Sequence, residues 1–251
     1  MAALPLTAKA HPSFNDGADE ILYTPVCFHS AAVCLAQFAF ISNTKRNAMN
    51  IPPDIIGYFT TTADNSPLDI LRDRRPDAKL HAQEAFHALF TPDNPGNVSL
   101  TERFALGLFT TTLHQATDLA AFYAEGLKKT GASPALLAAV SDTAKDTIHT
   151  GPYGAYPTGP LSSEDRPGPV FSTLPGNASV LGPRLAAALQ HTHMLVLHPR
   201  DANADAIQML FDAGWNEDGI VTLSQLVTFL CYQIRLIHGL RVVAETMENS
   251  Q

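Results

Sequence analysis

Two carboxylates and a histidine could together carry acid/base chemistry: Glu102, His114 and Asp118. His114 and Asp118 are one helical turn apart, so their side chains could pair if a helix continues through both. Glu102 is twelve residues from His114, roughly 18 Å along a helix axis, so these two cannot touch on one straight helix. All three are candidate catalytic residues. Helix capping is the favoured alternative for Glu102 and Asp118, while for His114 a catalytic role and a core histidine both stay open.

A second set of polar residues lies on a long apolar stretch near the C-terminus: Gln225, Tyr232 and Arg235. At 100° per residue, Tyr232 lies about 20° and Arg235 about 80° from Gln225, so they share one helix face. A guanidinium on an apolar helix needs a carboxylate, a carbonyl or a bound anion. These are the candidate substrate-binding residues, and the favoured alternative for Arg235 is a structural salt bridge.

Three histidines, at positions 191, 193 and 198, suggest a metal cluster at first sight. On a regular helix His191 and His198 are two turns, roughly 10 Å, apart, and His193 points the opposite way. One metal ion cannot bind all three, so no metal is predicted. His198 is interpreted instead as part of a helix terminus, with its imidazole near the negative end of the helix dipole.

The totals exclude several classes of protein. A formal net charge of −8 argues against a nucleic-acid binder. The three cysteines, at 27, 34 and 231, predict a reducing compartment without structural disulfides. The apolar run 24–41 comes after acidic residues and is interrupted by polar ones, so neither a signal peptide nor a membrane span is predicted. No nucleotide-binding fingerprint occurs, and no cofactor is expected. The predicted location is cytoplasmic.

Helices must position these residues. Ser99 and Glu102 have the spacing of a capping box. Asp118, Asn203 and Asn216 are predicted helix caps as well, and Ser133 with a proline after it starts another helix. The apolar spacing predicts helices over 77–90, 100–113, 119–129, from 134, 182–197, 204–213 and 217–245, so the predicted fold class is all-α.

The chain divides into four predicted parts. Residues 1–48 differ in composition from the rest of the chain and are predicted to be a poorly ordered extension. One explanation of this change is a native start at Met49. Residues 49–149 form a first helical half and 178–251 a second, together one domain. Residues 150–177 are rich in glycine and proline and cannot hold a helix, so they form a connector. Its tyrosines predict that it packs on the surface.

Short motifs in a fixed order resemble the carboxymuconolactone decarboxylase / alkylhydroperoxidase D superfamily. Leu100-Thr-Glu-Arg103 is similar to the family's entry into its active-site helix. Ala213-Gly-Trp215, followed by Asp218 to Phe229 and then Arg235 to Leu240, resembles its closing helices. The resemblance covers roughly residues 66–243. It implies an alkylhydroperoxidase D-like bundle of two helical halves that forms homo-oligomers through helix faces.

The peroxidase signature of that family has two cysteines and a histidine at fixed distances from its glutamate. Counted from Glu102, these positions hold His114, Thr117 and Ala121, so only the glutamate carries over. One thiolate must attack peroxide and a second must resolve the sulfenic acid. The two-cysteine mechanism is therefore excluded at this site. The expected function is acid/base chemistry on a small organic molecule, and the alternative is a non-catalytic oligomeric partner that kept the fold.

Overall fold

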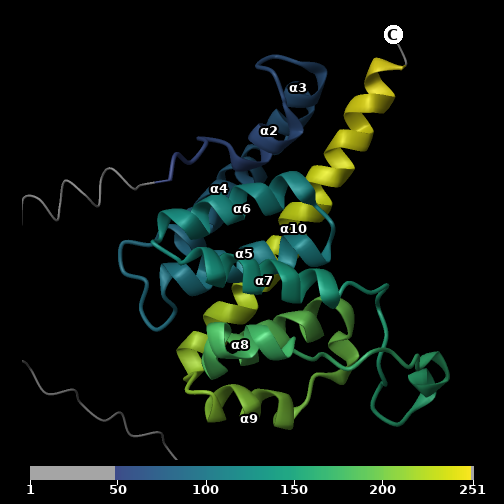
Figure 1. The fold of residues 1–251 in the computed structure, drawn as a ribbon. Helices are drawn as coiled ribbons and strands as arrows, with labels where there is room; N and C mark the ends of the chain where they lie inside the picture. Colours follow the sequence, from purple (N-terminus) through teal and green to yellow (C-terminus); the bar gives the residue numbers. More distant parts are fainter. Residues whose placement is uncertain (1–48, 250–251) are drawn as a thin grey trace, which may run out of the picture. The chain divides into compact units, whose positions relative to one another are not determined.

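A computed structural model describes residues 49–249, and their regular elements are helices (Figure 1). All described residues belong to one compact unit that begins at Asn47, and the predicted N-terminal extension lies outside them. The all-α class is confirmed for the described residues, which contain no β-strand. The α-helices are α2 (Ile55–Thr60), α3 (Pro67–Asp73), α4 (Pro76–Phe90), α5 (Leu100–Leu113), α6 (Thr117–Lys129), α7 (Pro134–Asp146), α8 (Pro175–Leu197), α9 (Ala204–Asp212) and α10 (Glu217–Glu248).

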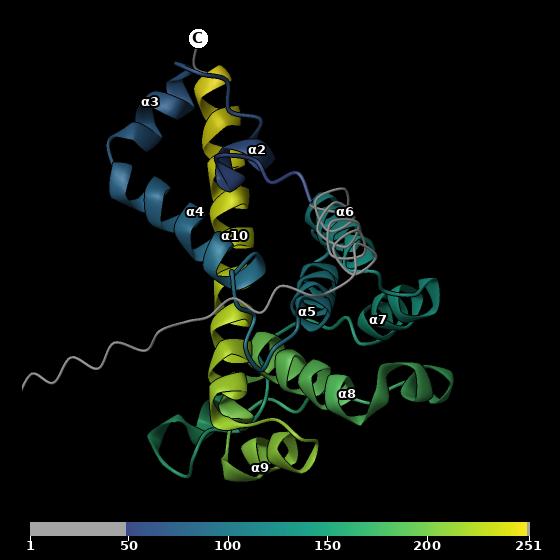
Figure 2. The ribbon, with the colours of Figure 1, turned by 90° about the vertical axis from the view of Figure 1, so that its left-hand side faces the viewer.

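Helix α5 lies at the centre and packs against α6, α7, α8 and α10 (Figure 2). Its start is the predicted capping box, in which Ser99 accepts from the Glu102 amide while the Glu102 carboxylate accepts from the Ser99 amide. Gly107 allows α6 to approach closely, because a β-carbon there would lie 2.5 Å from the ring of Tyr123. Ten of the fourteen residues of α5 are buried, so this helix forms the core on which its neighbours pack.

Helix α10 runs along the whole bundle and joins its two ends (Figures 1 and 2). Asn216 caps it as predicted, and Leu223, Leu226 and Leu230 are fully buried. Its contacts are with α5 and α8 and also with α2, α3 and α4. Among the described helices it alone is long and apolar enough to cross a bilayer, but half of its most apolar window is buried inside the protein. That is the pattern of a core helix.

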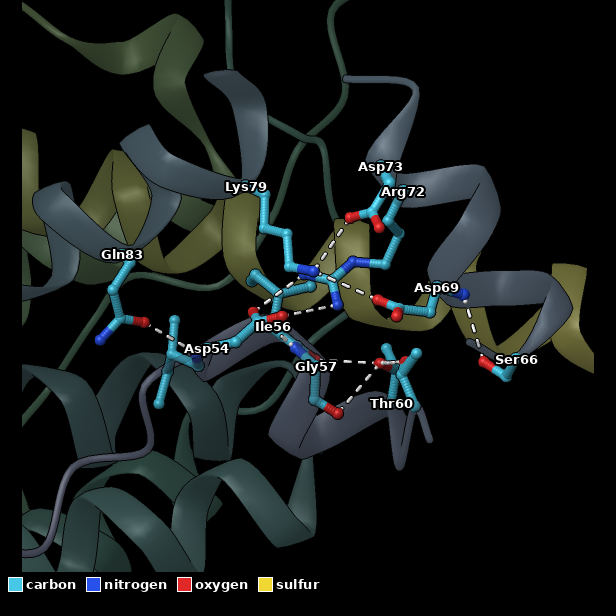
Figure 3. Close-up of polar contacts among 12 residues, drawn as sticks. Asp54, Ile56, Gly57, Thr60, Ser66, Asp69, Arg72, Asp73, Lys79 and Gln83 are labelled. Carbon is cyan, nitrogen blue, oxygen red and sulfur yellow. Dashed lines mark hydrogen bonds and ion pairs between the residues drawn. The ribbon is translucent and has the colours of Figure 1, made fainter. Parts of the chain in front are cut away.

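Ion pairs tie α2, α3 and α4 together (Figure 3). Asp54 caps α2 and also binds Arg72 of α3, with a nitrogen–oxygen distance of 2.7 Å. Lys79 of α4 binds Asp69 and Asp73 of α3 at 3.2 and 3.1 Å. Burial alone would raise the pKa of Asp54, but the hydrogen bonds from Arg72 and the Gly57 amide, together with the charges of Arg72 and Lys79, outweigh it and lower that pKa. The pairs fix α3 and α4 against α2, which packs on α10.

Two details differ from the sequence prediction. Asp118 does not cap α6: the helix begins at Thr117, two residues before the predicted start, and Asp118 lies in its first turn. Helix α8 begins at Pro175, seven residues before the predicted start, with a break at Gly182, where φ is +68°, followed by Pro183. Asp118 contacts Arg241 of a distant helix instead of capping α6, and a proline stands at the start of α8.

The connector packs closely on the second half. Between α7 and α8 it contains one short 3-10 helix, η1 (Pro160–Glu164), and a β-bridge between Gly154 and Arg166. Tyr153 is buried, and its ring leaves no room for a β-carbon at Gly168. Gly154 has φ +102°, a conformation that favours glycine. The connector therefore forms a defined wall against α8 and the residues after it.

Candidate functional site

A cavity of about 450 Å³ opens where α5, α6 and α10 meet. We call it the His114 cavity. Its walls are residues 114–119, which join α5 to α6, together with Ile234, Arg235, Ile237, His238 and Arg241 of α10. Three of the six residues singled out from the sequence, His114, Asp118 and Arg235, line it. It is large enough for a small organic molecule.

His114 stands at the end of α5, and the left-handed Gln115 (φ +56°) then turns the chain into α6. Its Nε2 lies 3.5 Å from the Sγ of Cys231 on α10. Burial, and then the charge of Arg235, lower the pKa of His114, so the imidazole is neutral at pH 7. In the tautomer that carries its hydrogen on Nε2, the ring donates to Sγ and Nδ1 is unprotonated. This Nδ1 makes no hydrogen bond with the described residues, so His114 can act as a base.

The thiol beside His114 is not activated. Burial raises the pKa of Cys231, and the charge of Arg235 offsets that only in part. Nucleophilic cysteines have lowered pKa values, because the thiolate is the reactive form. Cys231 is also the sole cysteine among the described residues. The pair therefore holds a neutral base next to a neutral thiol.

Positive charge dominates the walls of the His114 cavity. Arg241 donates to the Phe59 carbonyl and to the Asp118 carboxylate, so these two charges neutralise each other. Arg235 is exposed and makes no hydrogen bond or ion pair with the described residues. Its guanidinium is thus free to hold a carboxylate, which it matches in geometry. The cavity suits an anionic ligand.

The other three predicted residues lie elsewhere. Glu102 is occupied by its capping box and by Arg184 of α8, at 2.6 Å. Tyr232 lines a separate pocket of about 230 Å³ between α10 and the N-terminal helices. Gln225 is exposed, ten residues and about 15 Å along α10 from Arg235. The shared face of Gln225, Tyr232 and Arg235 therefore does not open into one cavity.

Sequence reasoning missed two residues that line this cavity, His238 and Arg241, and the thiol of Cys231, which lies beside His114. A local signal exists for Cys231, which lies one turn before Arg235 on the same helix. No local signal in the sequence indicates Arg241, because its partner Asp118 is 123 residues away.

Comparisons with models of protein families, with curated proteins and with solved structures find no match to this chain. Among the described residues, no group of three or more His, Cys, Asp or Glu side chains is placed to hold a metal ion. The groups that line the His114 cavity include a neutral imidazole and a free guanidinium, and the Cys231 thiol lies beside the imidazole.

Proposed function

We propose that the protein performs acid/base chemistry on a small organic carboxylate in the His114 cavity. His114 accepts a proton from the substrate through Nδ1. Arg235 binds the carboxylate and holds the carbon acid near that nitrogen. The observation that carries this proposal is the neutral imidazole beside an unpartnered guanidinium in one cavity.

The proposed class is an alkylhydroperoxidase D-like or carboxymuconolactone decarboxylase-like helical bundle in the cytoplasm. Its support is the order of the motifs in the sequence together with the all-helical fold. We further propose that copies of the chain associate through helix faces, because Val221, Tyr232 and Val242 of α10 are between 44% and 55% exposed. Light scattering should give a mass above 27 kDa, and a clean monomer at micromolar concentration would overturn the oligomer.

The alternative is a non-catalytic partner that kept the fold. Glu102 and Asp118 favour it, since both carboxylates are occupied by arginines in structural contacts. The two functions differ at His114, which has no structural partner other than Cys231 among the described residues.

The decisive experiment is proton exchange in D₂O. The protein is incubated with a panel of small carboxylates, with and without a lactone ring, and deuterium uptake next to the carboxylate is followed by NMR. His114→Gln should lower the exchange rate by about 100-fold or more, since general bases contribute factors of that size. Arg235→Gln should mainly raise KM. His81→Gln, at an exposed site on α4, is the matched control and should not change the rate.

Exchange that is equally fast in the wild type and the His114→Gln variant would overturn the assignment of the base. A wild type that leaves every compound unchanged would favour the non-catalytic partner. We also propose that no two-cysteine peroxidase mechanism operates. Peroxide consumption with a dithiol reductant should be negligible, and robust turnover that vanishes in the Cys27→Ser, Cys34→Ser, Cys231→Ser variant would contradict this.

A further inference from the structure

A second cavity, of about 620 Å³, lies between the connector and the second helical half. We call it the connector cavity. Residues 153–155 and 165–171 of the connector form one wall; the other consists of α8, the short 3-10 helix η2 (Pro199–Asp201) and α9. Much of the lining is apolar, including Phe171, Ala187, Met194 and Met209. Its volume and walls are those of a site for a small molecule.

His191 gives this apolar cavity one specific polar group. It lines the cavity and is 95% buried, with 5% of its surface exposed. Its Nε2 lies 3.5 Å from the hydroxyl of Ser224, which already donates its single hydrogen to the Ile220 carbonyl. The Ser224 oxygen can therefore only accept, so Nε2 carries the imidazole hydrogen. Burial lowers the pKa of His191 and keeps the ring neutral. Its Nδ1 is then a bare acceptor.

That acceptor has no partner. The Nδ1 of His191 is buried without a hydrogen bond to any described residue. A buried polar atom left in this state costs on the order of 1–3 kcal/mol. A ligand with an O–H donor in the connector cavity would satisfy it.

A chain of hydrogen bonds fixes the wall next to His191. Asp201 accepts from His198 Nδ1 at 2.9 Å, His198 Nε2 lies 3.2 Å from His193 Nδ1, and His193 Nε2 lies 3.3 Å from the Thr147 carbonyl. The Asp201 carboxylate and the Thr147 carbonyl lie at the two ends of the chain, and the four ring nitrogens of His193 and His198 lie between them. Every ring nitrogen of this pair is committed, so the pair holds the wall in place and leaves His191 to meet a ligand.

The charges at the rim disfavour an anion. Asp165, Asp201 and Asp205 line the cavity with one arginine, Arg166. A carboxylate would meet a net negative surface. A neutral hydroxyl satisfies His191 without this repulsion.

We propose that the connector cavity binds a small, mostly apolar molecule with one neutral hydroxyl group, such as a phenol or an aryl alcohol. The hydroxyl donates to His191 Nδ1, and the ring of the ligand packs against Phe171, Met194 and Ala187. This site is separate from the His114 cavity and does not depend on the function proposed there.

The test compares para-cresol with 4-methylanisole, which keeps the ring and the oxygen but lacks the donor. Dissociation constants are measured at pH 7 by NMR titration of the full-length protein. The wild type should bind para-cresol about tenfold more tightly than the ether, because only the phenol satisfies Nδ1. His191→Phe keeps a ring of similar shape without the acceptor, and it should bind both compounds equally. His81→Phe, on the exposed face of α4, should keep the preference.

A second variant keeps the proposal testable if His191→Phe does not fold. Ala187→Phe fills the cavity from α8 and should abolish binding of both compounds, with the thermal unfolding curve showing that the fold persists. Equal binding of the two compounds by the wild type would overturn the proposal. So would a preference that survives in His191→Phe, or binding that survives in Ala187→Phe. Proton exchange at His114 is not part of the readout, so failure here leaves the proposed function standing.

Discussion

The two cavities use histidine in opposite surroundings. In the His114 cavity the imidazole stands beside a free guanidinium and an opening to solvent, so it can meet an anionic substrate and exchange a proton with it. In the connector cavity His191 is buried among apolar side chains with aspartates at the rim, so it can bind only a neutral hydroxyl. Burial lowers the pKa of both rings. The charges around each histidine, rather than its pKa, decide what it can bind.

The largest expected effect is a loss of folding stability in acid, on the side of the molecule that carries the connector cavity. Burial, and then the neighbouring His198, lower the pKa of His193 to about 4. The unfolded chain binds a proton at this residue near pH 6.5, and the folded chain does not until about pH 4. The contribution of His193 to the free energy of unfolding is therefore fully present above pH 6.5. It falls by about 3 kcal/mol as the pH drops toward 4.

Urea unfolding from pH 7.5 to 4 measures this loss. In His193→Gln the free energy of unfolding should depend less steeply on pH below 6.5 than in the wild type. His81→Gln, which changes an exposed histidine, should keep the wild-type slope. If His193→Gln also kept that slope, the histidine pair would not be the acid-sensitive part of the connector side.

A smaller effect should distinguish the two cavities by packing. In Gly168→Ala the new β-carbon would lie 2.1 Å from the Tyr153 ring, so the wall of the connector cavity must shift. We expect a loss of about 1–3 kcal/mol of stability and weaker binding of para-cresol, with exchange at His114 unchanged. Gly176→Ala is the matched control, because nothing lies within 4 Å of its β-carbon position. Equal stability of the two variants would show that the connector is not packed as described.

The smallest effect is expected at Tyr232. It lies in a third pocket, so Tyr232→Phe should leave both proton exchange and para-cresol binding within about twofold of the wild type, as is usual for a surface substitution. Exchange kinetics and an NMR titration with para-cresol, both on the Tyr232→Phe variant, measure the two quantities. A tenfold change in exchange would return Tyr232 to the substrate site.

Local interactions explain what the sequence could predict. Ser99, Ser133, Asn203 and Asn216 each cap the predicted helix, because a cap depends on residues two or three positions away. Asp118 is also of a residue type that commonly caps helices, but its partner is Arg241 on another helix. No spacing rule finds such a pair.

The connector cavity shows a different limit of sequence reasoning. A regular helix predicts that His193 points away from His191 and His198, yet His193 and His198 are hydrogen-bonded. The reason is that α8 ends at Leu197, so His198 turns back toward the helix and meets Asp201 in η2. A prediction based on one straight helix fails where the helix ends. The sequence also could not predict that Nδ1 of His191 is unpaired, because this depends on the contact between Nε2 and Ser224, 33 residues away.

One crossed binding measurement tests most directly whether the two cavities select ligands by charge. The probes are 4-methylbenzoate and para-cresol, which share a ring and differ in the head group. They are titrated by NMR into the wild type, Arg235→Gln and His191→Phe at pH 7. We predict that Arg235→Gln loses affinity for the benzoate alone, about tenfold or more, and that His191→Phe loses its preference for the phenol alone. A variant that loses both ligands, or two variants that lose neither, would contradict two separate and oppositely selective sites.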